Sequence, residues 1–328
     1  MKLLTVAALV LSSLAASGAN AQTGKLKFVI PSTATTAFLP HYVAQDLGWL
    51  KKAGLEVEEL VVLGDSNAIR AILSGNGDIV GTGTISTFTA IANTAPLKAV
   101  ASWQPIADYQ VVAQSRFNTL KDLETASFAA ASIGGLTTAV PSMLMKKHGH
   151  DTSRMRFLTV GGHEARLQAV ISKKVDSAIV SNLYASLGQR TSDIKVLASV
   201  AKEFPGLGYA YVVTTDSALA DPARRARLET YVRYAVVEAS RLIMKSPGEA
   251  AKVMKGRAPD IDMSVIEGAI KALNEDKVWG TNGGLEASVI DFTLKVAMEI
   301  GELKTPLKTE QVVDRRVLDR VLAQTGRQ

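Results

Sequence analysis

The chain has 328 residues, 47% of them hydrophobic, a formal net charge of +6 and no cysteine. This length and apolar content allow one or two domains with ample cores, although no disulfide bond can reinforce them. Lysine and arginine are scattered, with no basic run longer than two residues. The charge therefore indicates a solvated surface that mildly favours anions, and we expect no binding to nucleic acid.

The first 21 residues have the pattern of a secretory signal. Lys2 precedes an apolar run, 3–14, and Ala19-Asn20-Ala21 offers small residues on either side of a cleavage position. The run is shorter than the roughly 20 apolar residues that a membrane-spanning helix needs. We therefore expect export and cleavage after Ala21.

The rest of the chain alternates strand and helix patterns. Strands are expected at 26–30, 56–63, 78–81, 97–102, 110–113, 127–132, 156–160, 176–180, 195–200 and 209–215, and late helices at 222–244, 248–254, 264–274 and 285–300. This alternation favours parallel sheets. Two stretches, 103–108 and 204–208, interrupt the rhythm, and we interpret them as crossovers between two lobes.

A weak internal sequence repeat, called the echo below, supports two lobes with the same order of elements. At an offset of 98 residues, the pairs Gly64/Gly162, Ala71/Ala169, Ser74/Ser172 and Asp78/Asp176 coincide. A second echo, at an offset of 100 residues, relates Phe28–Ser32 to Phe128–Ser132. Each copy would be a strand and a helix of an α/β lobe.

Five loops between a strand and a helix are rich in Gly, Ser, Thr and Asn. They lie at 32–36, 64–67, 83–87, 132–138 and 181–182. Ligands of open α/β sheets bind beyond the carboxyl ends of the strands, where helix N-termini offer free N–H groups. The candidate ligand contacts in these loops are Ser32, Thr35, Thr36, Ser66, Gly83, Thr84, Ser132, Gly134, Gly135, Thr137, Thr138 and Asn182. Taken singly, each polar one is more often an ordinary helix cap, so the set carries the argument rather than any member.

The stretch from Leu39 to Glu58, LPHYVAQDLGWLKKAGLEVE, follows the first strand and its hydroxyl-rich loop. It resembles the opening of the nitrate/sulfonate/taurine-type solute-binding proteins, the family that includes the NMT1/THI5-like domain. The resemblance covers about 26–217. It implies an α/β, type II periplasmic-binding-protein fold with two lobes, a cleft and two crossovers. The lobes would be 22–105 and 106–206, with a return strand and C-terminal helices at 207–328.

The family resemblance also implies a function. The chain would be a periplasmic, monomeric binding protein without a cofactor. It would trap a small molecule by hinge closure about 104–108 and 205–208, and an ABC permease with its ATPase would receive the ligand. We expect an organic anion, a sulfonate or carboxylate that could be aromatic. A neutral pyrimidine or thiamine precursor, and a ligand-sensing partner of a sensor kinase, are the alternatives.

The same family resemblance implies which residues would contact the ligand. The loop at 132–138 would meet the acidic group of the ligand. The motif 161–166 matches a family pattern and makes Arg166 the best charged candidate, with His163 beside it in the loop, although Arg166 could simply pair with Glu164. Three aromatic residues, Phe38, Trp103 and Tyr184, could form walls, and Trp103 could instead be buried at a crossover.

The sequence supports an enzymatic function less well than a binding function. Pyrimidine synthases of the THI5 type share the fold but carry a cysteine-rich iron motif, which a chain without cysteine lacks. The sequence contains neither a Gly-x-Ser-x-Gly elbow nor a Walker-type phosphate loop. The pair His148 and His150 could hold a metal only with further ligands, and none is near in sequence. We expect neither catalysis nor a metal site.

Overall fold

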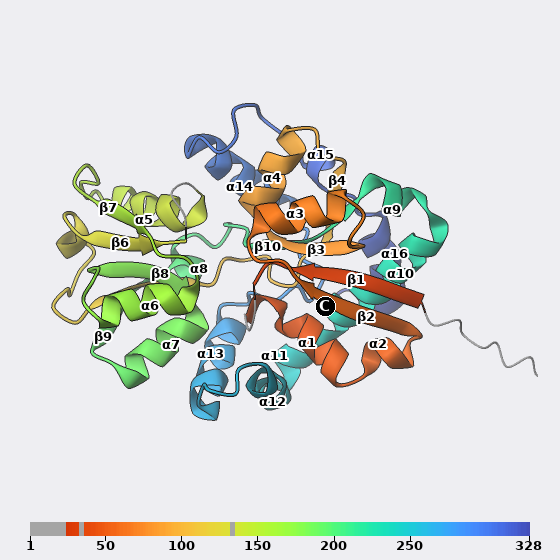
Figure 1. Ribbon diagram of the computed structural model, residues 1–328, viewed down its shortest axis with the longest axis horizontal. Helices are drawn as coiled ribbons and strands as arrows, with labels where there is room; N and C mark the ends of the chain where they lie inside the picture. Colours follow the sequence, from red (N-terminus) through yellow and green to blue (C-terminus); the bar gives the residue numbers. More distant parts are fainter. Residues whose placement is uncertain (1–23, 33–35, 132–134) are drawn as a thin grey trace, which may run out of the picture.

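The computed structural model describes residues 24–32, 36–131 and 135–328. Two five-stranded sheets, each flanked by helices, form two lobes that lie side by side (Figure 1). The signal segment and three loop candidates, Thr35, Ser132 and Gly134, lie outside the described residues. No helix in the described ranges is long and apolar enough to span a membrane.

All ten expected strands are present. They are β1 (Gly24–Ile30), β2 (Leu55–Val61), β3 (Ile79–Gly83), β4 (Leu97–Ala101), β5 (Tyr109–Gln114), β6 (Ser127–Ala130), β7 (Arg156–Thr159), β8 (Ser177–Ser181), β9 (Ile194–Ser199) and β10 (Ala210–Thr215). The first sheet has the order β2-β1-β3-β10-β4 and the second the order β7-β6-β8-β5-β9.

The expectation of parallel sheets was wrong in one respect, because both sheets are mixed. Strand β10 runs antiparallel to β3 and β4, and β5 runs antiparallel to β8 and β9. Each of these strands enters its sheet directly from a crossover. The alternation of strands and helices along the chain carries no information on the direction of such a strand.

The internal echo corresponds to a repeated structure. Gly64 and Gly162 directly precede α3 (Asp65–Leu73) and α6 (His163–Ile171). Asp78 accepts the backbone N–H of Lys27 at 2.9 Å, and Asp176 accepts that of Ser127 at 2.8 Å. Equivalent aspartates thus fasten the start of β3 to β1 in the first lobe and the start of β8 to β6 in the second.

The helices of the first half are η1 (Thr36–Phe38), α1 (Leu39–Asp46), α2 (Trp49–Lys52), α3, α4 (Thr84–Ala92), η2 (Lys121–Leu123), α5 (Leu136–Lys147), α6, α7 (Asn182–Thr191) and α8 (Val200–Glu203). Those of the C-terminal part are α9 (Asp216–Ala220), α10 (Pro222–Val232), η3 (Arg233–Glu238), α11 (Ala239–Lys245), α12 (Pro247–Arg257), α13 (Met263–Glu275), α14 (Ala287–Glu299), α15 (Thr309–Val312) and α16 (Arg316–Thr325). The segment η3 is a π-helix that joins α10 to α11.

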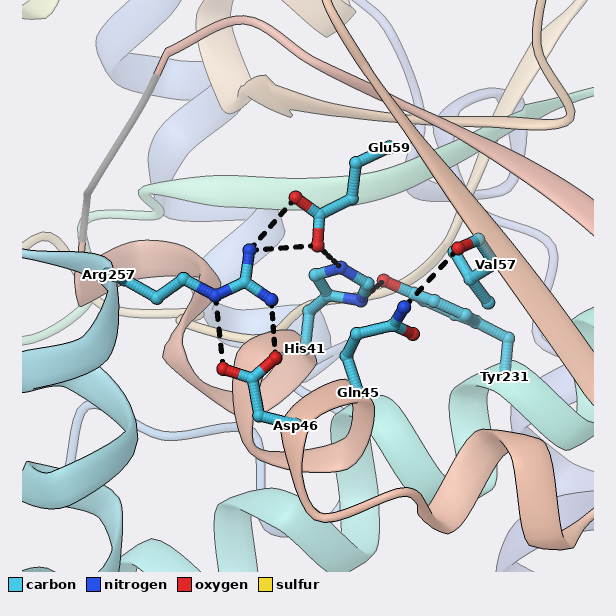
Figure 2. Close-up of polar contacts among 7 residues, drawn as sticks. All are labelled: His41, Gln45, Asp46, Val57, Glu59, Tyr231 and Arg257. Carbon is cyan, nitrogen blue, oxygen red and sulfur yellow. Dashed lines mark hydrogen bonds and ion pairs between the residues drawn. The ribbon is translucent and has the colours of Figure 1, made fainter.

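The C-terminal helices pack mainly on the first lobe, and one polar network fastens α12 there (Figure 2). Arg257 at the end of α12 pairs with Asp46 of α1 and with both carboxylate oxygens of Glu59 in β2, at 3.1 Å. Glu59 also contacts the buried His41 at 3.1 Å, whose other ring nitrogen lies 3.0 Å from the hydroxyl of Tyr231. Burial lowers the pKa of His41, so its ring is neutral between these partners.

The two crossovers are bonded to each other as a short ribbon. Ala107 donates its N–H to Leu207 O at 3.0 Å, and Tyr209 donates to Pro105 O at 3.2 Å. The chain is continuous with β5 on one side of this ribbon and with β10 on the other. The ribbon is therefore a covalent and hydrogen-bonded link between the two lobes.

The lobes also touch away from the ribbon. Helix α13 packs against α7 of the second lobe, as Figure 1 shows at the lower edge of the molecule. The backbone N–H of Gly135, just before α5, donates to Glu302 Oε1 at 2.8 Å. Glu302 follows α14 and its carbonyl accepts the hydroxyl of Thr89 in the first lobe. The structure thus holds the lobes together on both sides of the ribbon.

Candidate functional site

Arg166 is a cation that the fold buries almost completely near the facing loops. It lies one turn into α6 and only 2% of it is exposed. Its Nε donates to Ile179 O at 2.7 Å, one terminal nitrogen donates to Gly161 O, and the other donates to His163 Nδ1 at 3.1 Å. These bonds use three of the five N–H groups of a guanidinium.

No carboxylate of the described residues pairs with this cation. Among the residues that the structure describes, Arg166 forms no ion pair, and the pairing with Glu164 that the sequence allowed is not formed. Burial lowers its pKa, and the nearest groups that oppose this are the neutral phenols of Tyr109 and Tyr209. A buried cation without a counterion is costly, so the arrangement is suited to an anion from outside the chain.

His163 forms the adjacent wall. Its Nδ1 accepts the N–H of Ser181 at 2.8 Å as well as the Arg166 bond, so a neutral ring carries its proton on Nε2. Burial and the Arg166 charge hold its pKa well below the ordinary value. The ring stacks on Tyr184 with centroids 5.8 Å apart and planes at 9°, and on Tyr109 at 6.0 Å. Arg166 is thus flanked by a flat aromatic surface.

The equivalent position in the first lobe is Asp65, which the sequence analysis missed. Asp65 Oδ2 accepts the N–H of Gly83 at 3.0 Å, as His163 accepts that of Ser181. Burial raises its pKa, and bonds from Ser86 and Gly83 oppose that effect. The self-alignment at 98 residues pairs Asp65 with His163, so the echo already contained the signal.

A second polar group lies at the crossover. Asp108 is 1% exposed, and its Oδ2 accepts the N–H of Asn182 at 3.4 Å. The side chains of Gln104 and Thr36 lie next to it. Hydrogen bonds from both side chains to its carboxylate oppose the effect of burial on its pKa. Within the described part of the chain, Gln104 Oε1 is buried without a hydrogen-bond partner. Burial raises the pKa of Asp108 to about 6.

Two tyrosines connect these groups. Tyr109, which follows Asp108, and Tyr209, which precedes β10, meet edge to face with centroids 5.2 Å apart, and their phenols share a hydrogen bond. The charges of Arg166 and Asp108 act on both phenols in opposite directions. Burial raises the pKa of Tyr109 to about 12, so it is a neutral donor or acceptor. Sequence reasoning missed Asp108, Gln104 and both tyrosines.

Several candidate hydroxyls have partners within their own loops. Thr137 Oγ1 accepts the N–H of Ala131 at 3.1 Å, and Thr138 donates to Gly135 O at 3.2 Å. Thr84 donates to Gly208 O of the ribbon at 3.0 Å. Ser66 is exposed, whereas Ser32, Gly83 and Gly135 are half-buried and Thr36 and Asn182 are buried. The N–H of Gly135 is occupied by Glu302.

Phe38 and Trp103 do not present aromatic surface. They are 3% and 0% exposed and pack edge to face in the core of the first lobe, with centroids 5.3 Å apart. Gly81 lies directly against both rings, and a Cβ there would be 2.5 Å from Phe38. Because both rings are buried, neither forms the cleft wall that we expected. Trp103 is instead a buried residue at the crossover, as in the alternative interpretation. The rings near Arg166 are Tyr184, Tyr109 and Tyr209 instead.

The two histidines considered as metal ligands contact different carboxylates. His148 pairs with Glu203 at 3.0 Å and His150 with Glu124 at 3.6 Å. No group of three potential metal-binding side chains occurs among the described residues.

Comparisons with known proteins agree with this architecture. The NMT1/THI5-like family model matches residues 35–250. The chain belongs to this family. No curated protein sequence matches it.

Solved structures of similar shape share little sequence with the chain. A protein from Bordetella bronchiseptica is 18% identical with a TM-score of 0.74, over 93% of this chain and 98% of the other. The periplasmic aliphatic sulphonate-binding protein SsuA of Escherichia coli is 15% identical with a TM-score of 0.67, over 89% and 92%. The periplasmic nitrate-binding protein NrtA of Synechocystis is 12% identical with a TM-score of 0.74, over 93% and 90%. The α/β fold with two lobes is therefore that of the periplasmic binding proteins.

Proposed function

We propose that this chain is the periplasmic solute-binding component of an ABC importer and that it captures a small organic anion between its lobes. The observation that carries the proposal is Arg166, a buried cation without a carboxylate partner among the described residues. Family membership supports it, as do similar structures of proteins described as binding sulphonates and nitrate.

The cellular arrangement forms part of the same proposal. Residues 1–21 are a signal that directs the mature monomer to the periplasm, where a permease and its ATPase receive the ligand. The lobes are 22–105 and 106–206, and 207–328 returns to the first lobe. The protein binds its ligand unchanged, without a cofactor or catalysis.

Arg166 gives the anion its position. Two N–H groups of the guanidinium have no acceptor within the described ranges, and a carboxylate or sulfonate can accept both. The stacked rings of His163 and Tyr184 provide a flat surface beside it for an apolar or aromatic part of the ligand. A neutral heterocycle would leave the Arg166 charge uncompensated, which favours an acid.

Closure of the two lobes would require a ligand that contacts both of them. A ligand favours the closed arrangement only if it binds that state better than the open one. Arg166 and His163 belong to the second lobe, and Asp65 and Thr36 belong to the first. A ligand that touches both sets would draw the lobes together about the ribbon at 104–108 and 205–208.

The test is a thermal-shift screen followed by calorimetry on the mature chain. The panel contains alkyl and aryl sulfonates, carboxylates, nitrate and thiamine-related pyrimidines. A ligand at a hundredfold its dissociation constant stabilises the protein by about 2.7 kcal/mol. For the acid that binds, Arg166→Gln should weaken affinity by about 30-fold or more, since removing one partner of a buried charged pair costs about 2–5 kcal/mol.

Arg154→Gln is the matched control, because Arg154 is exposed and lies in the same lobe. It should bind like the unmodified protein. Equal affinity of Arg166→Gln and the unmodified protein for the acid would overturn the proposed site. Binding of pyrimidines alone would overturn the proposed ligand class.

A further inference from the structure

Helix α14 has three faces, and each has a different neighbour. The helix lies at the upper edge of the molecule in Figure 1, where it packs on α4 of the first lobe. Side chains four positions apart share one face of a helix. The face towards solvent consists of the exposed residues Asp291, Lys295 and Glu299. The other two faces are apolar and belong to different lobes.

One apolar face of α14 packs into the first lobe and the other packs into the second. The residues in the buried core of the first lobe are Ile290, Leu294 and Ala297. Val296 is 1% exposed and belongs to the buried cluster of the second lobe, and Phe292 and Ile300 pack against that cluster. The helix is thus shared between the cores of both lobes.

The first half of α14 is fixed to the second crossover. Thr293 is 0% exposed, and its hydroxyl accepts the N–H of Gly208 at 2.7 Å. A Cβ on Gly208 would lie 2.9 Å from the Thr293 oxygen, so this close approach requires glycine. A Cβ on Gly206 would lie 3.4 Å from the ring of Phe292. These contacts place the first half of α14 beside the ribbon that links the lobes.

The end of α14 reaches the second lobe at a different place. The chain reverses at Gly301, whose φ is 77°, and Glu302 donates its N–H to Ala297 O at 3.0 Å. The next residue, Leu303, is 2% exposed in the core of the first lobe, so the backbone of Glu302 is anchored there. The carboxylate of Glu302 nevertheless accepts the N–H of Gly135 at 2.8 Å, at the start of α5 in the second lobe. The positive end of the α5 dipole favours a carboxylate at this position.

The two contacts lie at different distances from the ribbon. Thr293 and Glu299, the last residue of α14, are about 9 Å apart along the helix axis, at about 1.5 Å per residue. Points further from a pivot move further when a body rotates. A rotation of the lobes about the ribbon would therefore change the contact of Glu302 more than that of Thr293.

We propose that α14 is a latch between the lobes. It is fixed to the first lobe and to the second crossover, and Glu302 at its end fastens the second lobe in the closed arrangement, so that Glu302 strengthens ligand binding without contacting the ligand. The lobes are close together here, because Thr36 of the first lobe and Asn182 of the second are 1% and 7% exposed. The effect on affinity rests on the proposed function, since a contact that favours closure strengthens binding only in a protein that closes on its ligand.

A latch has a different signature from a ligand contact. The bond between Glu302 and Gly135 involves no ligand atom, so it favours the closed state by the same factor whichever ligand lies between the lobes. Its removal should therefore weaken the binding of different acids by one common factor. A residue that touches the ligand would instead change the ratio of the affinities for two acids.

The first experiment measures the separation of the lobes directly. The chain has no cysteine, so Lys51→Cys and Lys121→Cys together introduce one spin label at an exposed position of each lobe. Pulsed electron paramagnetic resonance compares this labelled protein with the same protein carrying Glu302→Ala or Glu299→Ala, each freed of ligand by unfolding and refolding. Glu299 is the matched control, because it is an exposed carboxylate of the same helix that pairs with Lys295 at 3.8 Å. Glu302→Ala should lengthen or broaden the label distance, and Glu299→Ala should leave it unchanged.

The second experiment is calorimetry at pH 7.5 with those sulfonates and carboxylates of the panel that raise the melting temperature of the unmodified protein. Glu302→Ala should weaken the binding of each acid about threefold to tenfold, the range expected for one hydrogen bond, and by the same factor for all of them. Glu302→Gln keeps a neutral acceptor for the N–H of Gly135 and should have an intermediate effect. Glu299→Ala should bind like the unmodified protein. Circular dichroism and the melting temperature confirm that each variant is folded.

The outcomes separate the latch from the proposed function. Identical label distances in Glu302→Ala and Glu299→Ala would overturn the latch and leave the anion site intact. Unchanged or tighter binding in Glu302→Ala, or a loss that differs between acids, would also overturn it, because Glu302 would then have no part in closure or would act on the ligand itself. Failure of every acid to bind would overturn the proposed function instead, and the label distances would still decide whether Glu302 fastens the lobes.

Discussion

Asp108 makes the ligand-free protein sensitive to pH in a way that one substitution should remove. In an unfolded chain the carboxyl has an ordinary pKa, 3.8, and in the folded protein burial raises this pKa to about 6. Between these values the folded state holds a proton that the unfolded state releases. Ionised Asp108 therefore destabilises the fold, and stability is lost as the pH rises through this window.

The difference of about two pKa units corresponds to about 3 kcal/mol at pH 7.5, because each unit is worth about 1.36 kcal/mol. Asp108→Asn has the same shape and no charge. Its Oδ1 can still accept the N–H of Asn182. The variant should gain stability relative to the unmodified protein as the pH rises, and about 2 kcal/mol of this gain should develop between pH 4.5 and 7.5.

Urea unfolding at pH steps from 4.5 to 7.5 measures this gain. Both proteins are first unfolded, dialysed and refolded so that no ligand remains. The other titrating groups are common to both proteins and cancel in the difference. A stability difference that is the same at every pH, or that shrinks towards neutral pH, would refute the inference that Asp108 is buried without adequate partners.

Three further predictions test other parts of the fold. Arg257→Leu leaves Asp46 and Glu59 without their common partner and should cost about 1–3 kcal/mol in urea unfolding, whereas Arg320→Leu breaks an exposed pair with Glu229 and should cost less than about 1 kcal/mol. Asp78→Asn and Asp176→Asn should destabilise by similar amounts, about 1 kcal/mol each, and a loss confined to one lobe would contradict their equivalent roles. Glu302→Ala removes the contact with Gly135 and should enlarge the radius of gyration of the ligand-free chain in X-ray scattering, and an unchanged radius would show that this contact does not hold the lobes together.

The strands were predictable because their signal is local. Most predicted strands have an apolar run that the structure buries, although β7 is mostly exposed. The echo between the lobes marked equivalent elements correctly, as Gly64 and Gly162 show. The direction of β5 and β10 was not predictable in this way. Their direction depends on which end of the sheet a crossover enters, and that is a property of the whole lobe.

Only the site residues that lie close together in the sequence were predictable. Arg166 and His163 lie on one helix start, so their proximity follows from sequence spacing. Tyr109 and Tyr209 are about a hundred residues apart and meet because the two crossovers pair as a ribbon. No local pattern marks such a meeting. Phe38 failed as a cleft residue because the pattern does not reveal which side of its helix packs on Gly81.

The shared plan of the lobes also explains why the two sides of the site differ in charge. At equivalent positions, one lobe places Asp65 and the other places His163, and each accepts the N–H of the last residue of an equivalent strand, β3 or β8. The backbone role is the same, but the electrostatic effect is opposite, because only the second lobe adds Arg166. Two lobes with identical side chains would hold a symmetric ligand in either of two orientations. Under the proposed function, the acidic end of a ligand would therefore lie against the second lobe, because that lobe supplies the buried cation.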